Sequence, residues 1–258
     1  MQFDIYILDY NINQQVKIAR SSSLGALLRV GKMHKMAQPL DEFLLQHCGV
    51  QKQHDWPLAA FEATALSEAI TTQYWRAAPV SLSLLRDSFA LEQQVTLTDA
   101  EIQDLTVLFC QFFAQDGLHF SVDQNGGWLV QHQKNWAVET HHLQQVLGRN
   151  IAQFQAVGQD AHQIRGIQNQ LQMLLHEHPI NQAREAANLP ICNSLWLYGG
   201  GQIPTQVHNL VDYFVGENTL VKALAKQSNK PLFSCQQLEA WLQSEQNKQP
   251  AKMSLPVI

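Results

Sequence analysis

The chain has 258 residues and a formal net charge of -5 at pH 7. This length suits one large domain or two small ones that need no disulfides or structural metals. Charged residues make up only 15% of the sequence, whereas glutamine occurs 34 times, so we expect a polar but weakly charged surface. The acidic balance argues against a general nucleic-acid binder, which needs a basic face to neutralise phosphates, although it still allows a local basic patch.

The N-terminal residues 1–9 lack the basic and long apolar regions of a signal peptide, and residues 3–8 instead predict a short strand. The sequence has no run of about 18 apolar residues, so no membrane span is expected. The cysteines are widely spaced and form no Cys-x-x-Cys pair, which predicts neither a zinc knuckle nor a redox pair. A reducing cytoplasm is therefore the expected location. The cysteines are Cys48, Cys110, Cys192 and Cys235.

The first part of the chain, residues 1–150, predicts a mixed α+β structure. Helical apolar spacing occurs at residues 23–28 and 40–45, and residues 74–91 predict extended chain, because Pro79 disfavours a helix and apolar residues then alternate with serines. Thr98 and Glu101 form a capping box that begins a helix to about residue 115. A hairpin is indicated around residues 123–127, and Thr140 is expected to cap a short helix ending at Gly148. Residues 74–135 thus predict a small α+β module.

The second part, residues 151–246, predicts an α/β structure with a segment of parallel sheet. A long amphipathic helix is expected over residues 160–178, followed by a short helix at 182–187. An apolar run at 195–198 predicts a buried strand that enters a glycine loop. Further elements are expected as strands at 211–215 and 231–233 and helices at 217–227 and 236–243, with a loose tail at 247–258. The predicted class is therefore mixed α/β.

The densest group of functional residue types lies between residues 176 and 201. Arg184 and Asn181 are three residues apart on an expected helix, so both could face one point. Arginine suits bidentate contact with phosphate or carboxylate, and glycines after a strand let an anion approach backbone N–H groups. We therefore expect an anion or ligand site at the end of the 195–198 strand. Its residues are Arg184, Asn181, His178, Asn193, Gly199, Gly200 and Gly201.

The same residues allow a purely structural interpretation. The glycines would then form a tight turn, and the polar side chains would hold the segment around Pro179 together. A metal site is not expected, because zinc needs three or four converging ligands. The histidine pairs His141–His142 and His176–His178 do not provide such a set.

Residues 172–204 closely resemble a bacterial family of RpfE-type regulatory proteins. The resemblance rests on His178-Pro179-Ile180-Asn181-x-x-Arg184, followed by Asn193-Ser194-Leu195-Trp196-Leu197-Tyr198-Gly199-Gly200-Gly201. It extends upstream to residues 75–82 and 147–149, where Ala78 and Ser81 replace an aspartate and a histidine of the family's pattern. Membership would imply a regulatory role.

The block also resembles the archaeal-type, cofactor-independent phosphoglycerate mutases, which belong to the alkaline-phosphatase-like metalloenzymes. That resemblance implies a two-metal phosphotransfer site, which needs several carboxylates and histidines around the ions. The chain departs from the mutases here, because Asp9 is followed by Tyr10-Asn11-Ile12 without the Asp-Gly motif, and an Asp-His pair is missing.

Three hypotheses follow. The first is a non-catalytic, degenerate mutase-like protein that acts in regulation or senses a small phosphorylated or carboxylate ligand, without cofactor. The second is an active metal-dependent mutase or phosphohydrolase with an unrecognised site. The third is a structural module that binds a protein partner.

Overall fold

The computed structural model describes residues 38–64, 72–124, 126–204, 207, 213–234, 236–238 and 240. The expected strand at 3–8, the helix at 23–28, the tail at 247–258 and much of the helix at 236–243 lie outside these residues. In chain order, the elements are α2 (Leu40–His47), α3 (Leu58–Ala63), β1 (Gln73–Leu84), β2 (Phe89–Gln94), α4 (Asp99–Phe112), β3 (Leu118–Val122), β4 (Trp128–His132), α5 (Leu143–Val146), β5 (Arg149–Asn150), a 3-10 helix (Ile151–Phe154), α6 (Ala161–His176), α7 (Pro179–Ala186), β6 (Ser194–Gly201), β7 (Phe214–Val215), α8 (Thr219–Gln227) and β8 (Leu232–Phe233).

Six of the strands in the described residues form one sheet around the long strand β1. The sheet runs in the order β3-β4-β1-β2-β5, and β6 pairs with β1. All of these pairings are antiparallel. Strands β1 and β6 come from opposite sides of the predicted boundary near residue 150, so the sheet unites both parts of the chain. The structure is mixed α/β, as predicted, and its sheet is mostly antiparallel.

Side chains of β1 and β6 alternate between the two faces of the sheet, as a period of two residues requires. Trp75, Ala77, Leu195 and Leu197 belong to a core that α4 and α6 cover. Trp196 and Tyr198 point to the other face, where α5 and the 3-10 helix complete a second core. Burying both faces explains why every residue of β6 is buried.

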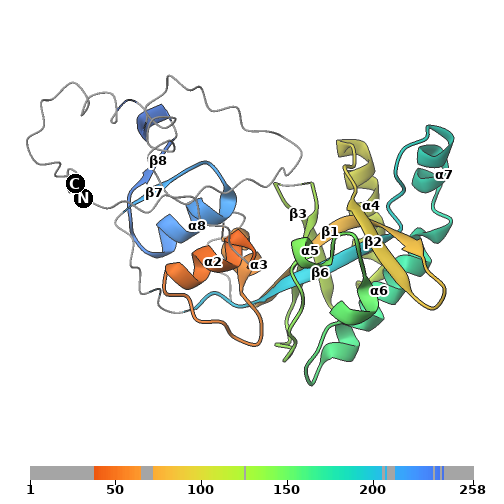
Figure 1. The fold of residues 1–258 in the computed structure, drawn as a ribbon, viewed down its shortest axis with the longest axis horizontal. Coiled ribbons are helices and arrows are strands. Elements are labelled where there is room, and N and C mark those ends of the chain that lie inside the picture. The colour runs from red at the N-terminus through yellow and green to blue at the C-terminus, as the bar shows by residue number, and fades with distance from the viewer. Residues whose placement is uncertain are drawn as a thin grey trace, which may run out of the picture.

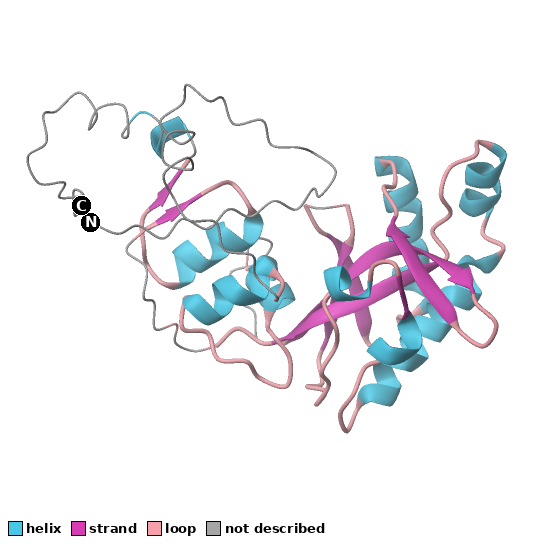
Figure 2. Cartoon of the chain, viewed as in Figure 1, coloured by secondary structure: helices cyan, strands magenta, loops and turns pink. Residues whose placement is uncertain are grey.

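Helices α2, α3 and α8 form a separate group, which we call the α2–α3–α8 unit. Figure 1 shows these helices together with β7 and β8 at one end of the molecule, and the sheet with α4, α6 and α7 at the other. Figure 2 shows the same division by element type. The unit has an apolar core of its own, which includes Leu44, Leu45, Leu58, Phe61, Leu220 and Leu224.

Most elements expected in residues 74–135 are confirmed. The Thr98 hydroxyl accepts from the Glu101 N–H at 3.3 Å, and the Glu101 carboxylate accepts from the Thr98 N–H at 2.7 Å, so the capping box begins α4. The hairpin is the β3–β4 pair. The expected cap of the short helix is wrong, because His142 caps α5 while the Thr140 hydroxyl donates to Asp55.

Three expectations for the second part are corrected. Gly199, Gly200 and Gly201 lie inside β6 rather than in a loop after it. In addition, β6 pairs antiparallel with β1, and the parallel pairing found among the described residues joins β7 to β8. Proline at the first position of α7 lets this helix start at residue 179, with His178 as its cap, three residues earlier than expected. Within the part of the chain that the structure describes, no helix has the length and apolar character to cross a membrane.

Candidate functional site

Arg184, the central residue of the predicted ligand site, makes four hydrogen bonds to three residues of the protein. Its Nη1 atom lies 2.8 and 2.9 Å from the two carboxylate oxygens of Glu101 on α4. Its Nε donates to the Pro190 carbonyl at 2.7 Å, and its Nη2 donates to the Thr96 carbonyl at 3.0 Å. The guanidinium is buried. Through these contacts it joins α7, α4 and two loops.

The amides of Asn181 and Asn193 each bind both backbone groups of one residue, and Asn181 also donates to the Leu175 carbonyl at 2.9 Å. Asn181 accepts from the Cys192 N–H at 2.9 Å and donates to the Cys192 carbonyl at 2.8 Å. Asn193 accepts from the Leu82 N–H at 2.7 Å and donates to the Leu82 carbonyl at 2.8 Å. An amide that binds both groups of one residue replaces a missing strand neighbour. Asn193 thus extends the pairing of β1 by one residue before the start of β6.

The three glycines allow close packing around the C-terminal end of β6. A Cβ on Gly200 would lie 2.1 Å from Nε1 of Trp75, and one on Gly201 would lie 2.7 Å from Cβ of Pro57. The Gly199 N–H donates to the Thr140 hydroxyl at 3.1 Å, and the Gly200 N–H lies 3.3 Å from a carboxylate oxygen of Asp55. These backbone groups therefore bind side chains of the protein itself.

Strand β6 divides the predicted site residues into two groups. Asn181, Arg184 and Asn193 lie near its first residue, whereas the glycines are its last three. An extended strand of eight residues spans roughly 23 Å between its first and last Cα atoms. One pocket therefore does not contain both groups, and the ligand-binding role of each group stays a prediction. His178 lies with the first group, where Nδ1 accepts from the Ile180 N–H at 3.3 Å.

Two glutamines use the same amide-to-backbone pairing as the asparagines. Gln73 binds both backbone groups of Trp136, at 2.7 and 3.1 Å. Gln53 binds both backbone groups of Gln202, at 2.7 and 3.1 Å. Sequence reasoning did not find these pairs, because the partners are 63 and 149 residues apart and no local pattern marks them.

A second group of buried charges in the described part of the chain lies on the α2–α3 side of the sheet. Arg76 of β1 donates from Nε and Nη2 to the two oxygens of Glu62 on α3, both at 2.6 Å. Its Nη1 donates at 2.6 Å to Asp41 on α2, which also lies 3.0 Å from Nε2 of His142. All four side chains are at most 4% exposed. We call Arg76, Asp41, Glu62 and His142 the buried charge cluster.

The cluster stabilises the charged form of Asp41 and sets the orientation of the His142 imidazole. Burial alone would raise the pKa of Asp41, but His142 and Arg76 overcome this effect and hold the pKa below its ordinary value. Nδ1 of His142 accepts from the Gln144 N–H at 3.2 Å, so the proton on Nε2 points to Asp41. Tyr198 packs against His142 and Arg76. Its ring centroid lies 4.8 Å from that of His142 and 5.7 Å from Cζ of Arg76.

The sequence contains one signal for this cluster that was missed. Arg76 stands in the apolar run Tyr74-Trp75-Arg76-Ala77-Ala78, and an arginine in a buried strand must be paired. Its partners could not be identified from spacing, because they come from residues 41, 62 and 142.

Two carboxyl groups beside the cluster have perturbed titration. Burial, together with the neighbouring charges of Asp41 and Asp55, raises the pKa of Glu42 from 4.5 to about 7. Burial also raises the pKa of Asp55, against hydrogen bonds from Thr140, Trp56 and Gly200 that favour its charged form. No group of three or more His, Cys, Asp or Glu residues within the described ranges is arranged to hold a metal ion.

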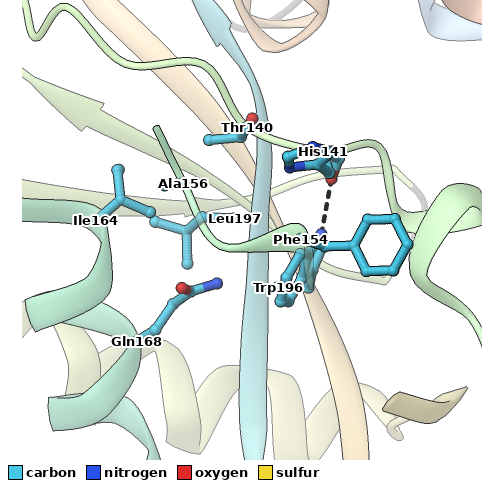
Figure 3. Close-up of a pocket in the computed structure, with 8 residues that line it drawn as sticks. All are labelled: Thr140, His141, Phe154, Ala156, Ile164, Gln168, Trp196 and Leu197. Atoms are coloured by element: carbon cyan, nitrogen blue, oxygen red, sulfur yellow. Dashed lines mark hydrogen bonds between the residues drawn. The ribbon is translucent and has the colours of Figure 1, made fainter. Parts of the chain in front are cut away.

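A small pocket opens on the other side of β6, between α6 and the 140–156 segment. Figure 3 shows its lining, in which Gln168 and Ile164 of α6 face Leu197 and Trp196. The pocket has no room for a water-sized sphere, whereas ligand pockets have volumes of about 300–1,000 Å³. Trp196 closes one wall by donating from Nε1 to the His141 carbonyl at 2.8 Å.

Comparisons with known proteins point to one kind of relative. No protein-family model matches the chain, so the resemblance to RpfE-type proteins rests on its motifs alone. A 2,3-bisphosphoglycerate-independent phosphoglycerate mutase of Methanothrix thermoacetophila is 30% identical over 84 residues, which are 31% of this chain and 21% of that enzyme.

Two solved structures are similar in part. A protein from Pyrococcus horikoshii has a TM-score of 0.42 and 18% identity, covering 77% of this chain and 48% of its own. The cofactor-independent phosphoglycerate mutase of Thermoplasma acidophilum has a TM-score of 0.42 and 14% identity, covering 84% of this chain and 64% of its own. The chain thus spans about a fifth of the curated relative it matches, and its similarity to phosphoglycerate mutases is distant.

Proposed function

We propose that this chain is a non-catalytic, phosphoglycerate mutase-like protein with a regulatory role, as its RpfE-type motifs suggest. One observation carries the proposal: the polar groups at which a ligand would be expected bind the protein itself. Arg184 binds Glu101 and two carbonyls, and the amides of Asn181 and Asn193 bind backbone groups. A catalytic site instead needs preorganised groups that are directed at the reacting atoms.

The enzymatic alternative has a direct test. Purified protein is incubated with 3-phosphoglycerate and added Mn²⁺ or Zn²⁺, and the formation of 2-phosphoglycerate is followed by NMR. We expect no conversion above the rate without protein. Conversion that scales with protein concentration and is abolished by a metal chelator would refute the non-catalytic role.

Sensing of a phosphorylated metabolite is a second candidate, which the contact between Arg184 and Glu101 favours. Both oxygens of the Glu101 carboxylate lie within hydrogen-bond distance of Nη1, so an internal carboxylate occupies the position that an anionic ligand would take. A ligand must displace Glu101 before it can bind there. The neutral variant Glu101→Gln weakens this competition.

Thermal shift measurements with 3-phosphoglycerate and with inorganic phosphate test the sensing role. If Arg184 is the anion contact, Glu101→Gln should be stabilised more strongly by either anion than the unmodified protein. Arg184→Ala should show no stabilisation. Equal shifts for all three proteins, or no shift for Glu101→Gln, would exclude anion sensing at Arg184 and leave a regulatory role exerted through a protein partner.

A further inference from the structure

We propose that the buried charge cluster is a releasable contact, through which the α2–α3–α8 unit docks on the sheet and from which it separates as a folded body. The proposal concerns a conformational change and does not depend on the function proposed above. It rests on the separate apolar cores of the two bodies and on the chemistry of the surface between them.

Helix α3 divides its side chains between the two bodies. Leu58 and Phe61 belong to the core of the α2–α3–α8 unit. Toward the sheet, α3 presents Ala59 and Ala63, which pack on Tyr74 and Leu129 in a small cluster, and Leu58 also lies against Gly199 of β6. Alanines bury little apolar area, and the free energy of burial scales with that area. The apolar part of the contact is therefore weak compared with the cores on either side of it.

The strong interactions across this contact are charged. Arg76 belongs to the sheet, and both of its acidic partners belong to the helices, at 2.6 Å in each case. His142, which also contacts Asp41, precedes α5 on the sheet side. Both ion pairs of Arg76, and the hydrogen bond between His142 and Asp41, thus join one body to the other.

Charges make such a contact specific but releasable. Burying the arginine and carboxylates removes them from water, and their mutual attraction offsets that cost only while the pairs are intact. When the bodies separate, each charge regains its hydration, so separation costs less than exposing an apolar surface of the same size. Surfaces between domains that move are more polar than cores for the same reason.

Native-state hydrogen exchange of the whole, unmodified chain in low urea tests the proposal first. We expect amides of α2, α3 and α8 to exchange through one shared opening, with a smaller urea dependence than amides of α6 and β4. Smaller urea dependence means that less surface is exposed than in global unfolding. Exchange of all these elements with a single urea dependence would overturn the proposal.

Substitution of Arg76 provides the second test. Arg76→Met removes the guanidinium from two buried carboxylates, of which Asp41 keeps His142, and it does so in the docked state only. Exchange in α2, α3 and α8 should therefore accelerate at least tenfold, while α6 changes much less. The control is Arg184→Met, because Arg184 is also buried and ion-paired but joins α7 to α4 within the sheet body, with a partner carboxylate that is partly exposed.

The control should accelerate exchange in α4 and α7 and leave the α2–α3–α8 unit unchanged. Uniform acceleration by Arg76→Met across both bodies, or equal patterns for the two variants, would show that the chain opens as one unit. If Arg76→Met does not fold, the urea series on the unmodified protein decides the question alone.

Discussion

Asn193 offers the clearest test of whether the predicted ligand residues hold the fold together. Its amide makes two hydrogen bonds, at 2.7 and 2.8 Å, to the backbone of Leu82, which is 7% exposed. Asn193→Leu keeps the branched shape of the side chain but removes both bonds and leaves a buried N–H and carbonyl unpaired. Each lost bond costs about 0.5–1.5 kcal/mol, and unpaired buried groups add to this. We expect a loss of about 2–3 kcal/mol in the free energy of unfolding.

Urea unfolding followed by circular dichroism measures this loss. With a urea dependence of about 2–3 kcal/mol/M, the midpoint should fall by about 1 M at unchanged slope. The matched control is Asn169→Leu, the same substitution at an exposed position of α6, where a surface change should stay within about 0.5 kcal/mol. If Asn193→Leu also stayed within that range, the two hydrogen bonds of the amide would not contribute to stability. The structural explanation would then be wrong, and Asn193 would again be a candidate ligand contact.

Three further predictions concern other described residues. Burial and neighbouring aspartates raise the pKa of Glu42 from 4.5 to about 7, so its proton stabilises the fold below pH 4.5 and this contribution is lost as the pH rises through 7. Glu42→Gln should therefore raise the free energy of unfolding by about 1–2 kcal/mol at pH 8, after discounting for partial exposure, and leave it unchanged at pH 4. Equal effects in urea unfolding at the two pH values would contradict this. Gly200→Ala should cost more than 3 kcal/mol by overpacking a buried indole, whereas Gly166→Ala, in open space on α6, should gain up to about 1 kcal/mol; thermal melts that rank them in reverse would refute the packing argument. Burial raises the pKa of Cys48 and Cys192 to about 12, so iodoacetamide at pH 8 should leave both unmodified in the folded protein, and mass spectrometry that finds either alkylated would contradict their burial.

The sequence predicted the elements that short-range chemistry determines. The capping box at Thr98 and the β3–β4 hairpin depend on residues three to five positions apart, and the amphipathic stripe of α6 is readable within one helix. Each signal lies within the segment that it organises. Tertiary contacts therefore did not override these predictions.

The glycines of β6 were interpreted wrongly because their reason is tertiary. Glycine weakens a strand and usually indicates a turn, so Gly199 to Gly201 predicted a loop. The structure shows instead that β6 passes directly against Trp75, Leu58 and Pro57, where any side chain would clash. These neighbours lie more than 100 residues away in sequence, and no spacing rule links them to the glycines.

The low share of charged residues is consistent with the way the fold uses neutral amides. Four amide side chains bind both backbone groups of a residue in another segment, a task that a neutral amide performs as donor and acceptor at once and that neither a carboxylate nor a lysine can perform. Such pairs carry no charge and therefore do not vary with pH. Within the described residues, the sheet body also contains a buried arginine, Arg184, but its partner Glu101 is partly exposed. The ion pairs in which both side chains are buried join Arg76 to Asp41 and Glu62, where the two bodies meet. This position favours a surface that is specific when closed and that regains its hydration when open.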